Sequence, residues 1–158
     1  MTEEYLISRA KKGDLKNVLK FTLALTRMSS KQNPFFKTAV KVKKIERKNL
    51  MKHLGNRKHL ILIAKKGNRI IGYSNSVIYK KNPLWKVKNE GCINGVFILP
   101  AYRKKGIAAA LVKETIFWMR KNKIKRVVLY VNVKNKIGKR AWKALGFKER
   151  ELTMDMRI

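Results

Sequence analysis

The chain has 158 residues, enough for one domain with a substantial hydrophobic core, and a hydrophobic content of 45% excludes a disordered protein. No apolar run approaches the length that spans a membrane, and a single cysteine, Cys92, excludes an internal disulfide and a cysteine-based zinc site. The N-terminal residues lack the apolar region of a signal peptide, so we expect a cytoplasmic protein with no membrane partner.

The charge of the chain is extreme, because 40 Lys and Arg residues against 9 Asp and Glu residues give a formal net charge of +31. The basic residues are spread over the whole sequence. Such a field attracts polyanions and repels polycations, which favours nucleic acid, a ribosome or an acidic protein as a partner. It weighs against polyamines, aminoglycosides and basic protein tails as substrates. A proteome-wide bias toward lysine is the alternative explanation, and the composition is compatible with both.

Hydrophobic periodicity and turn residues predict an α/β domain over residues 1–158. The predicted elements are, in chain order, a strand over 5–10, a helix after 13–14, a loop over 29–38, a helix over 39–54, strands over 59–65 and 69–79, a loop over 80–90, a strand over 91–99, a helix over 107–122, a strand over 126–133, a helix over 135–145 and a strand from Phe147. The order β-α-α-β-β-β-α-β-α-β predicts a mixed sheet with helices on both faces.

The stretch from Val96 to Val112 predicts an anion-binding loop. A strand ends at Pro100, a short basic loop ends at Gly106, and an Ala-rich helix follows. The first N–H groups of a helix have no partner within it and lie at the positive end of its dipole. A diphosphate fits such a loop; the alternative is an ordinary basic strand–helix junction. The residues expected to bind it are Arg103, Lys104, Lys105, Gly106, Ile107, Ala108 and Ala109.

A second motif, NKIGKRAWKALGF, occupies residues 135–147. The Asn135, the Trp142 seven residues later and the closing Leu-Gly-Phe stand in a fixed register, and Gly146 is placed to end a helix. Together with the R-x-x-G-x-A spacing of Arg103 to Ala108, this motif resembles the signatures of the GNAT N-acetyltransferase superfamily. The resemblance is detailed over residues 60–158 and in outline before them.

The resemblance implies a GNAT-like fold and acetyl-CoA as the cosubstrate. The acetyl group would pass to a primary amine of a protein or small molecule by direct transfer in a ternary complex. Two splayed parallel strands would hold the pantetheine arm on backbone groups of Phe97, Ile98 and Leu99, and Asn135 and Trp142 would complete the site. The alternative is a catalytically weak acyl-CoA-binding module associated with nucleic acid or a ribosome. A monomer and a homodimer are both compatible with the sequence.

Three residues are candidates for the proton transfers that acetylation of an amine requires. Glu90, at the start of the central strand, is the candidate base, with a solvated loop residue as the alternative. Many family members carry a tyrosine acid where this chain has Trp142, whose indole N–H donates hydrogen bonds but supplies no proton at neutral pH. We therefore expect Trp142 to hydrogen-bond the sulfur or to pack on the pantetheine. Tyr130 is the substitute acid, or lines the cleft.

The acceptor pocket is expected to be lined by residues 29–38, Tyr73, Asn75 and residues 80–93. The two histidines, His53 and His59, are six residues apart without a carboxylate pattern, so we expect no metal site and place both at the surface or at element boundaries.

Overall fold

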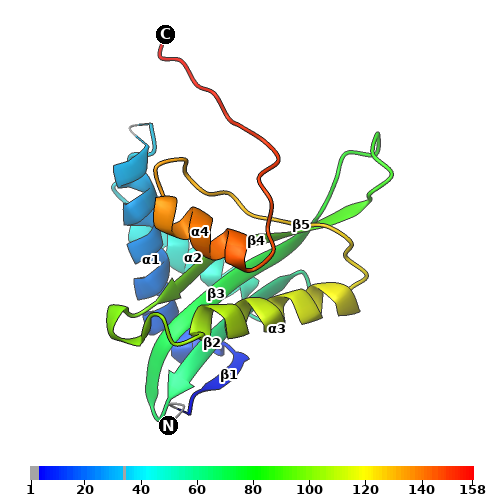
Figure 1. Cartoon of the computed structure of the whole chain (residues 1–158). Coiled ribbons are helices and arrows are strands. Elements are labelled where there is room, and N and C mark those ends of the chain that lie inside the picture. The colour runs from blue at the N-terminus through cyan, green and yellow to red at the C-terminus, as the bar shows by residue number, and fades with distance from the viewer. Residues whose placement is uncertain (1–3, 34) are drawn as a thin grey trace.

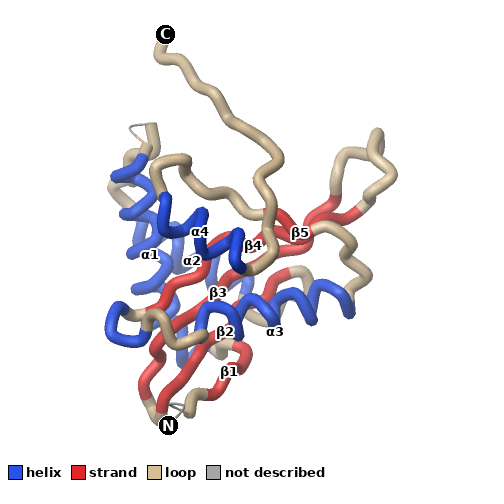
Figure 2. Tube along the Cα trace, viewed as in Figure 1, coloured by secondary structure: helices blue, strands red, loops and turns tan. Residues whose placement is uncertain are grey.

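The computed structural model describes residues 4–33 and 35–158. Its strands form one five-stranded sheet in the order β1-β2-β3-β4-β5 (Figures 1 and 2). The strands are β1 Leu6–Arg9, β2 His59–Lys66, β3 Arg69–Lys80, β4 Asn89–Ile98 and β5 Val127–Val128. The helices are α1 Leu15–Gln32, α2 Val42–His53, α3 Ile107–Lys121 and α4 Lys136–Ala144, with short 3-10 turns η1 Lys12–Asp14 and η2 Pro100–Tyr102. The first four strands are antiparallel, and β5 is parallel to β4.

Helices cover both faces of the sheet, which confirms the predicted fold class. Strand β2 is apolar throughout its centre because its alternate side chains enter two different cores. Leu60 and Leu62 pack with Leu111 and Met119 of α3, whereas Ile61 and Ile63 pack in the core formed with α1 and α2. The sheet is therefore the middle layer of three.

Strands β4 and β5 pair over only two residues before they separate. Gly91 is paired with Val127 and Cys92 with Val128, while β4 continues along β3 as far as Ile98. A bulge lies on β4 at the same place, since Asn75 is opposite Gly95 and Ser76 is opposite Ile93, which leaves Asn94 between them without a partner in the register. The C-terminal half of β4 thus lies beside an open edge.

The strand prediction for 126–133 was too long, because the ladder with β4 ends at Val128. The predicted closing strand from Phe147 was wrong. Residues 147–158 contain no strand, and this tail extends past the sheet (Figure 1), where Arg157 lies 5.4 Å from the ring centroid of Phe35. Its residues alternate between apolar and polar from Leu152 to Ile158, but alternation gives only the propensity for a strand, and a strand also needs a neighbour to pair with.

Two smaller differences concern the N-terminal half. Helix α1 extends to Gln32, so the loop predicted over 29–38 begins only after that residue. Pro34, assigned to the same loop, lies outside the described residues. In the ranges that the structure describes, no helix combines the length and the apolar character needed to cross a bilayer.

Gly72 on β3 is a point where the neighbouring strand β4 leaves no space for a side chain. A Cβ atom there would lie 3.1 Å from the carbonyl oxygen of Phe97 and 2.5 Å from the side chain of Ile98. Gly13 offers the matched control, because a Cβ atom there would meet nothing within 4 Å. We expect Gly72→Ala to lower the free energy of unfolding by about 1–3 kcal/mol and Gly13→Ala to leave it nearly unchanged. Chemical denaturation of both variants checks this, and equal stabilities would contradict the packing described.

Candidate active site

The loop between β4 and α3 has the conformation of an anion site. Lys104 and Gly106 adopt positive φ angles of 60° and 77°, which turn the chain sharply into the helix. The first backbone bond along this helix runs from the N–H of Ala110 to the carbonyl of Gly106, and no side chain caps the helix start. In the described part of the chain, the four N–H groups of residues 106–109 donate to no other residue. Four aligned donors at the positive end of a helix suit a phosphate group.

Arg103 anchors this loop to the end of β4. Its Nε donates to the carbonyl oxygen of Ile98 at 3.0 Å, and its guanidinium lies 5.8 Å from the ring centroid of Phe97. The backbone of Leu99 is also engaged, because its N–H donates to Ile71 and its carbonyl accepts from Tyr102. Polar groups of Arg103, Ile98 and Leu99, three residues predicted to bind the coenzyme, thus form hydrogen bonds within the protein.

The loop lies in a positive environment. The ring of Tyr102 has the cations of Lys66, Arg69 and Lys105 within 6.0 Å of its centroid. Cations over an aromatic face are held by its quadrupole and keep their charge. They add to the field of the helix start toward an anionic ligand.

Helix α4 carries the second predicted group of binding residues. The Asn135 side chain caps the helix by accepting from the N–H of Gly138 at 2.9 Å, and a Cβ atom on Gly138 would lie 2.5 Å from this amide. Trp142 is partly buried, and its ring meets Phe147 edge to face with centroids 5.4 Å apart. Asn135 and Trp142 therefore each have a structural role within the protein, in addition to the contact with a coenzyme that the sequence predicts.

Glu90 lies at the closed end of the gap between β4 and β5, and its side chain is 2% exposed. It accepts hydrogen bonds from the Tyr79 hydroxyl and the Arg126 guanidinium, and the Lys81 ammonium lies 3.5 Å away. Burial alone would raise the pKa of Glu90, but these partners outweigh it and hold the pKa below the ordinary value. A carboxylate that is stabilised in this way is a weak proton acceptor.

The three candidates for proton transfer are placed on different elements. Tyr130 follows β5 and is 81% exposed, and Trp142 is on α4. Among the described residues, no hydrogen bond, ion pair or ring contact joins Glu90, Tyr130 and Trp142 to one another. Cys92 is buried on β4, and burial together with the Glu90 charge raises the pKa of its thiol to about 11, which agrees with a core residue.

A polar cavity of about 280 Å³ lies between α1, α2 and the bulged part of β4. We call it the α1–α2 pocket; its lining residues are Thr22, Leu25, Thr26, Ser29, Glu46, Asn49, Leu50, His53, Tyr73, Asn75 and Asn94. Tyr73, Asn75 and Ser29 were among the residues predicted for the acceptor side. The prediction of the acceptor side did not include the α2 residues. These residues, Glu46, Asn49, Leu50 and His53, are spaced three, four and seven positions apart, which places them on one helical face.

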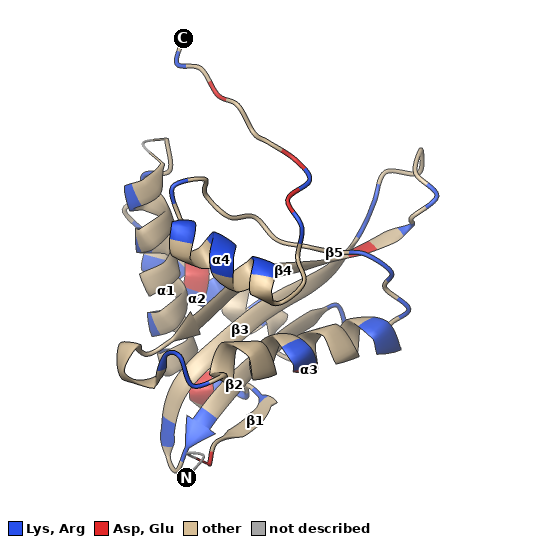
Figure 3. Ribbon diagram, in the orientation of Figure 1, with Lys and Arg blue, Asp and Glu red and all other residues tan. Residues whose placement is uncertain are grey.

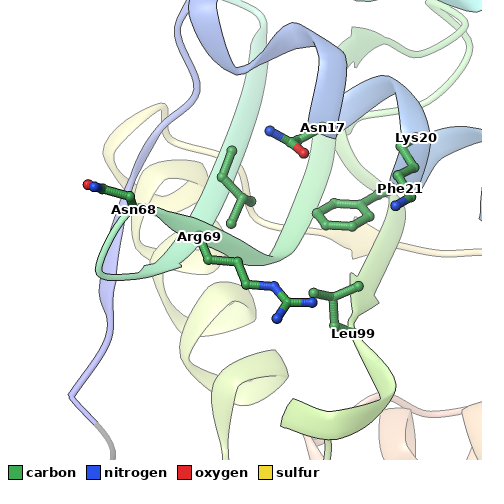
Figure 4. Close-up of a pocket in the computed structure, with 7 residues that line it drawn as sticks. Asn17, Lys20, Phe21, Asn68, Arg69 and Leu99 are labelled. Carbon is green, nitrogen blue, oxygen red and sulfur yellow. The ribbon is translucent and has the colours of Figure 1, made fainter.

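A second, wider cavity of about 400 Å³ lies at the other end of α1 (Figure 4). Lys20 and Phe21 of α1 line it from one side, and Arg69 extends across it toward Leu99. It carries two cations and no acidic residue. The remaining basic residues do not gather on one element, since Figure 3 shows Lys and Arg along all four helices.

The comparisons with known proteins agree with this geometry. The profile of the acetyltransferase (GNAT) family matches residues 25–147, which is most of the chain, and the protein therefore belongs to this family. No curated protein sequence matches the chain significantly.

Solved structures share the fold at low sequence identity. A tetramutant of the BH1408 protein from Bacillus halodurans has a TM-score of 0.84 and 16% identity, covering 97% of this chain and 99% of that one. A predicted acetyltransferase from Clostridium acetobutylicum with acetyl-CoA has a TM-score of 0.79 and 17% identity, covering 98% and 96%. The aminoglycoside 6'-N-acetyltransferase AAC(6')-IG from Acinetobacter haemolyticus has a TM-score of 0.77 and 18% identity, covering 97% of each chain.

The environment of Glu90 leads to a stability prediction. We expect Glu90→Gln to lower the free energy of unfolding by about 1–3 kcal/mol, because the Tyr79 hydroxyl and the half-exposed Arg126 guanidinium lose a charged acceptor. The pKa of Glu90 is lower in the folded protein, so its contribution is present at neutral pH and is lost as the pH falls from about 4.5 through the folded-state pKa. Denaturation at a series of pH values should show this loss in the wild type and not in Glu90→Gln.

The matched control is Glu149→Gln, which removes an acid that is 52% exposed and paired with Lys139 and Lys143 at the surface. Its stability should stay close to that of the wild type. A Glu90→Gln variant of unchanged stability but with acetyl transfer reduced by about 100-fold or more would instead identify Glu90 as the base.

Proposed function

We propose that the protein is an acetyl-CoA-dependent N-acetyltransferase that moves the acetyl group to a primary amine by direct transfer in a ternary complex. The observation that carries the proposal is the loop before α3, with four N–H donors at residues 106–109 next to the open edge of β4. The family membership supports it. The complexes of acetyl-CoA and coenzyme A described for structures of the same fold support it further.

The residues of the loop would hold the pyrophosphate of the coenzyme. The N–H groups of Gly106, Ile107, Ala108 and Ala109 point away from the helix they begin, and the side chains of Lys104 and Lys105 supply charge from the same turn. Small side chains at positions 108 and 109 leave the first turn open to the ligand. Arg103 contributes by fixing the loop to Ile98 rather than by extending toward the phosphates.

The backbone of β4 would hold the arm that leads from the pyrophosphate to the thioester. Beyond Cys92 this strand is paired with β3 alone, so its other edge faces the gap that β5 leaves. Of the three positions predicted for the arm, Ile98 is the best placed. Backbone groups of an antiparallel pair face each other at alternate residues, and because Leu99 donates to Ile71, Phe97 opposite Tyr73 also faces β3. The backbone of Ile98 faces the gap, where Arg103 binds its carbonyl and its N–H would meet the arm. When bound, acetyl-CoA supplies the acetyl group as an activated thioester.

Two of the predicted catalytic residues take modified roles in this proposal. Glu90 lies four residues before the bulge, or about 13 Å at about 3.3 Å per residue, and its bonds to Tyr79 and Arg126 favour a role in fixing the closed end of the gap. Trp142 would pack against the coenzyme arm from α4, with Phe147 holding its ring. Tyr130 is exposed to solvent and remains a candidate acid.

Replacing Gly106 tests the coenzyme site. We expect Gly106→Glu to weaken coenzyme A binding by more than about 100-fold, because a carboxylate would stand where phosphate binds and would repel it. Gly55→Glu is the matched control, since Gly55 has a φ of +79° and open space around it, as Gly106 has with +77°. Calorimetric titration of both folded variants makes the comparison. Unchanged affinity in Gly106→Glu would exclude this loop as the phosphate site.

The role of Trp142 leads to a second kinetic prediction. An indole cannot supply a proton at neutral pH, so Trp142→Phe should keep turnover within about tenfold of the wild type, less than the usual loss of a proton-transfer group. Thiol release from acetyl-CoA with a saturating amine measures it. A decrease of about a thousandfold or more at unchanged coenzyme affinity would show that Trp142 takes part in the chemistry.

A further inference from the structure

The α1–α2 pocket contains an acidic group in an otherwise basic part of the chain. Glu46 is the only acidic residue between Asp14 and Glu90, and it lines this cavity from α2. It is half-buried, and within the described residues no Lys or Arg side chain forms an ion pair with it. Lys43, Arg47 and other cations of α2 are exposed. A carboxylate that faces a cavity rather than the surrounding lysines is a binding group for a cation.

A second, independent feature of the pocket is an unpartnered buried acceptor. Asn75 on β3 is 9% exposed and lines the pocket, and its Oδ1 has no hydrogen-bond partner among the described residues. A buried amide oxygen without a partner costs free energy that a bound donor would recover. Asn75 and Glu46 together offer acceptors to a ligand that brings N–H groups.

The other titratable groups of the pocket are uncharged at neutral pH. Burial and the nearby charge of Lys52 lower the pKa of His53, whose ring stacks on His59 with centroids 3.8 Å apart. Burial raises the pKa of Tyr73 to about 12, and its hydroxyl is hydrogen-bonded to Thr22 at 3.1 Å. The pocket therefore carries one negative charge, from Glu46.

The pocket reaches the part of β4 where acetyl transfer would take place. Asn94, the extra residue of the bulge, is one of its lining residues, and a Cβ atom on Gly95 would lie 3.6 Å from the Tyr73 hydroxyl. One edge of this stretch of β4 is paired with β3, and its other edge faces the gap left by β5. A ligand in the α1–α2 pocket and a thioester in the gap would thus meet at the bulge.

We propose that the α1–α2 pocket is the acceptor site, that it holds one primary ammonium group on Glu46 and Asn75, and that its substrates are small monoamines whose remaining part is neutral or acidic. This inference rests on the proposed function. One carboxylate balances one ammonium, and a second positive charge on the ligand would meet the exposed cations of α2 and the net charge of +31. The volume of about 280 Å³ limits the ligand to a small molecule or a single side chain.

Three amines with the same four-carbon chain test this specificity: n-butylamine, 4-aminobutanoate and 1,4-diaminobutane. Each is titrated into 15N-labelled protein saturated with coenzyme A, and into the free protein, up to about 50 mM, a range that covers weak ligands. The side-chain amide signals of Asn75 and Asn94 report on the pocket independently of turnover. We expect both monoamines to shift these signals, and the diamine to bind more weakly.

Glu46→Gln should weaken the binding of n-butylamine by about 10- to 100-fold, the loss of one charge-assisted interaction, and leave coenzyme affinity unchanged. Glu114→Gln is the matched control, because Glu114 is an exposed acid on α3 and its replacement changes the net charge equally. The proposal is overturned if Glu46→Gln binds n-butylamine as well as the wild type, if the diamine binds more tightly than the monoamine, or if no amine shifts the Asn75 signal.

Acetyl transfer to the same amines, measured by mass spectrometry, separates the two proposals. Binding at Asn75 without any acetylated product would contradict the proposed function and leave the amine site in place. Acetylation at the same KM in wild type and Glu46→Gln would support the function and overturn the assignment of the pocket.

Discussion

The early separation of β4 from β5 is the constraint on which the rest of the site depends. A strand inside a sheet normally satisfies its backbone groups on both sides, and β4 does so for only two residues on its β5 side. The groups beyond Cys92 therefore need another partner. The loop before α3 lies at the end of this open edge, so the unpaired stretch of β4 and the free N–H groups of the helix start are adjacent along the chain.

Side-chain contacts hold both ends of this gap. Glu90, Tyr79 and Arg126 join β3, β4 and the start of β5 at the closed end, where the buried carboxylate of Glu90 accepts hydrogen bonds from both partners. At the other end, Arg103 ties the loop to Ile98. Between them lies the bulge at Asn94, a residue that lines the α1–α2 pocket. The candidate site thus combines an edge of the sheet with the loop before α3, which Arg103 ties to that edge.

The sequence predicts those parts of the protein that are determined by residues close together in the chain. The apolar ladder of α3 and the continuous apolar strand β2 are local patterns, and the junction from Pro100 to the start of α3 is contiguous, so these elements could be predicted. The α1–α2 pocket could not, because Glu46 and Asn75 line one cavity only through the packing of α2 on the sheet. The partners of Glu90 are equally distant, with Arg126 36 residues away. The tail from Phe147 shows the opposite case, a strand pattern without a neighbouring strand.

The imbalance of charge has a consequence for how the folded state responds to ionic strength. The described ion pairs involve few of the 40 basic residues, so most of the cations repel one another across distances comparable with the Debye length of about 8–10 Å in physiological salt. Added salt screens this repulsion more than it weakens the buried Glu90 contacts. The free energy of unfolding therefore rises with salt concentration, and the folded protein is least stable in dilute buffer.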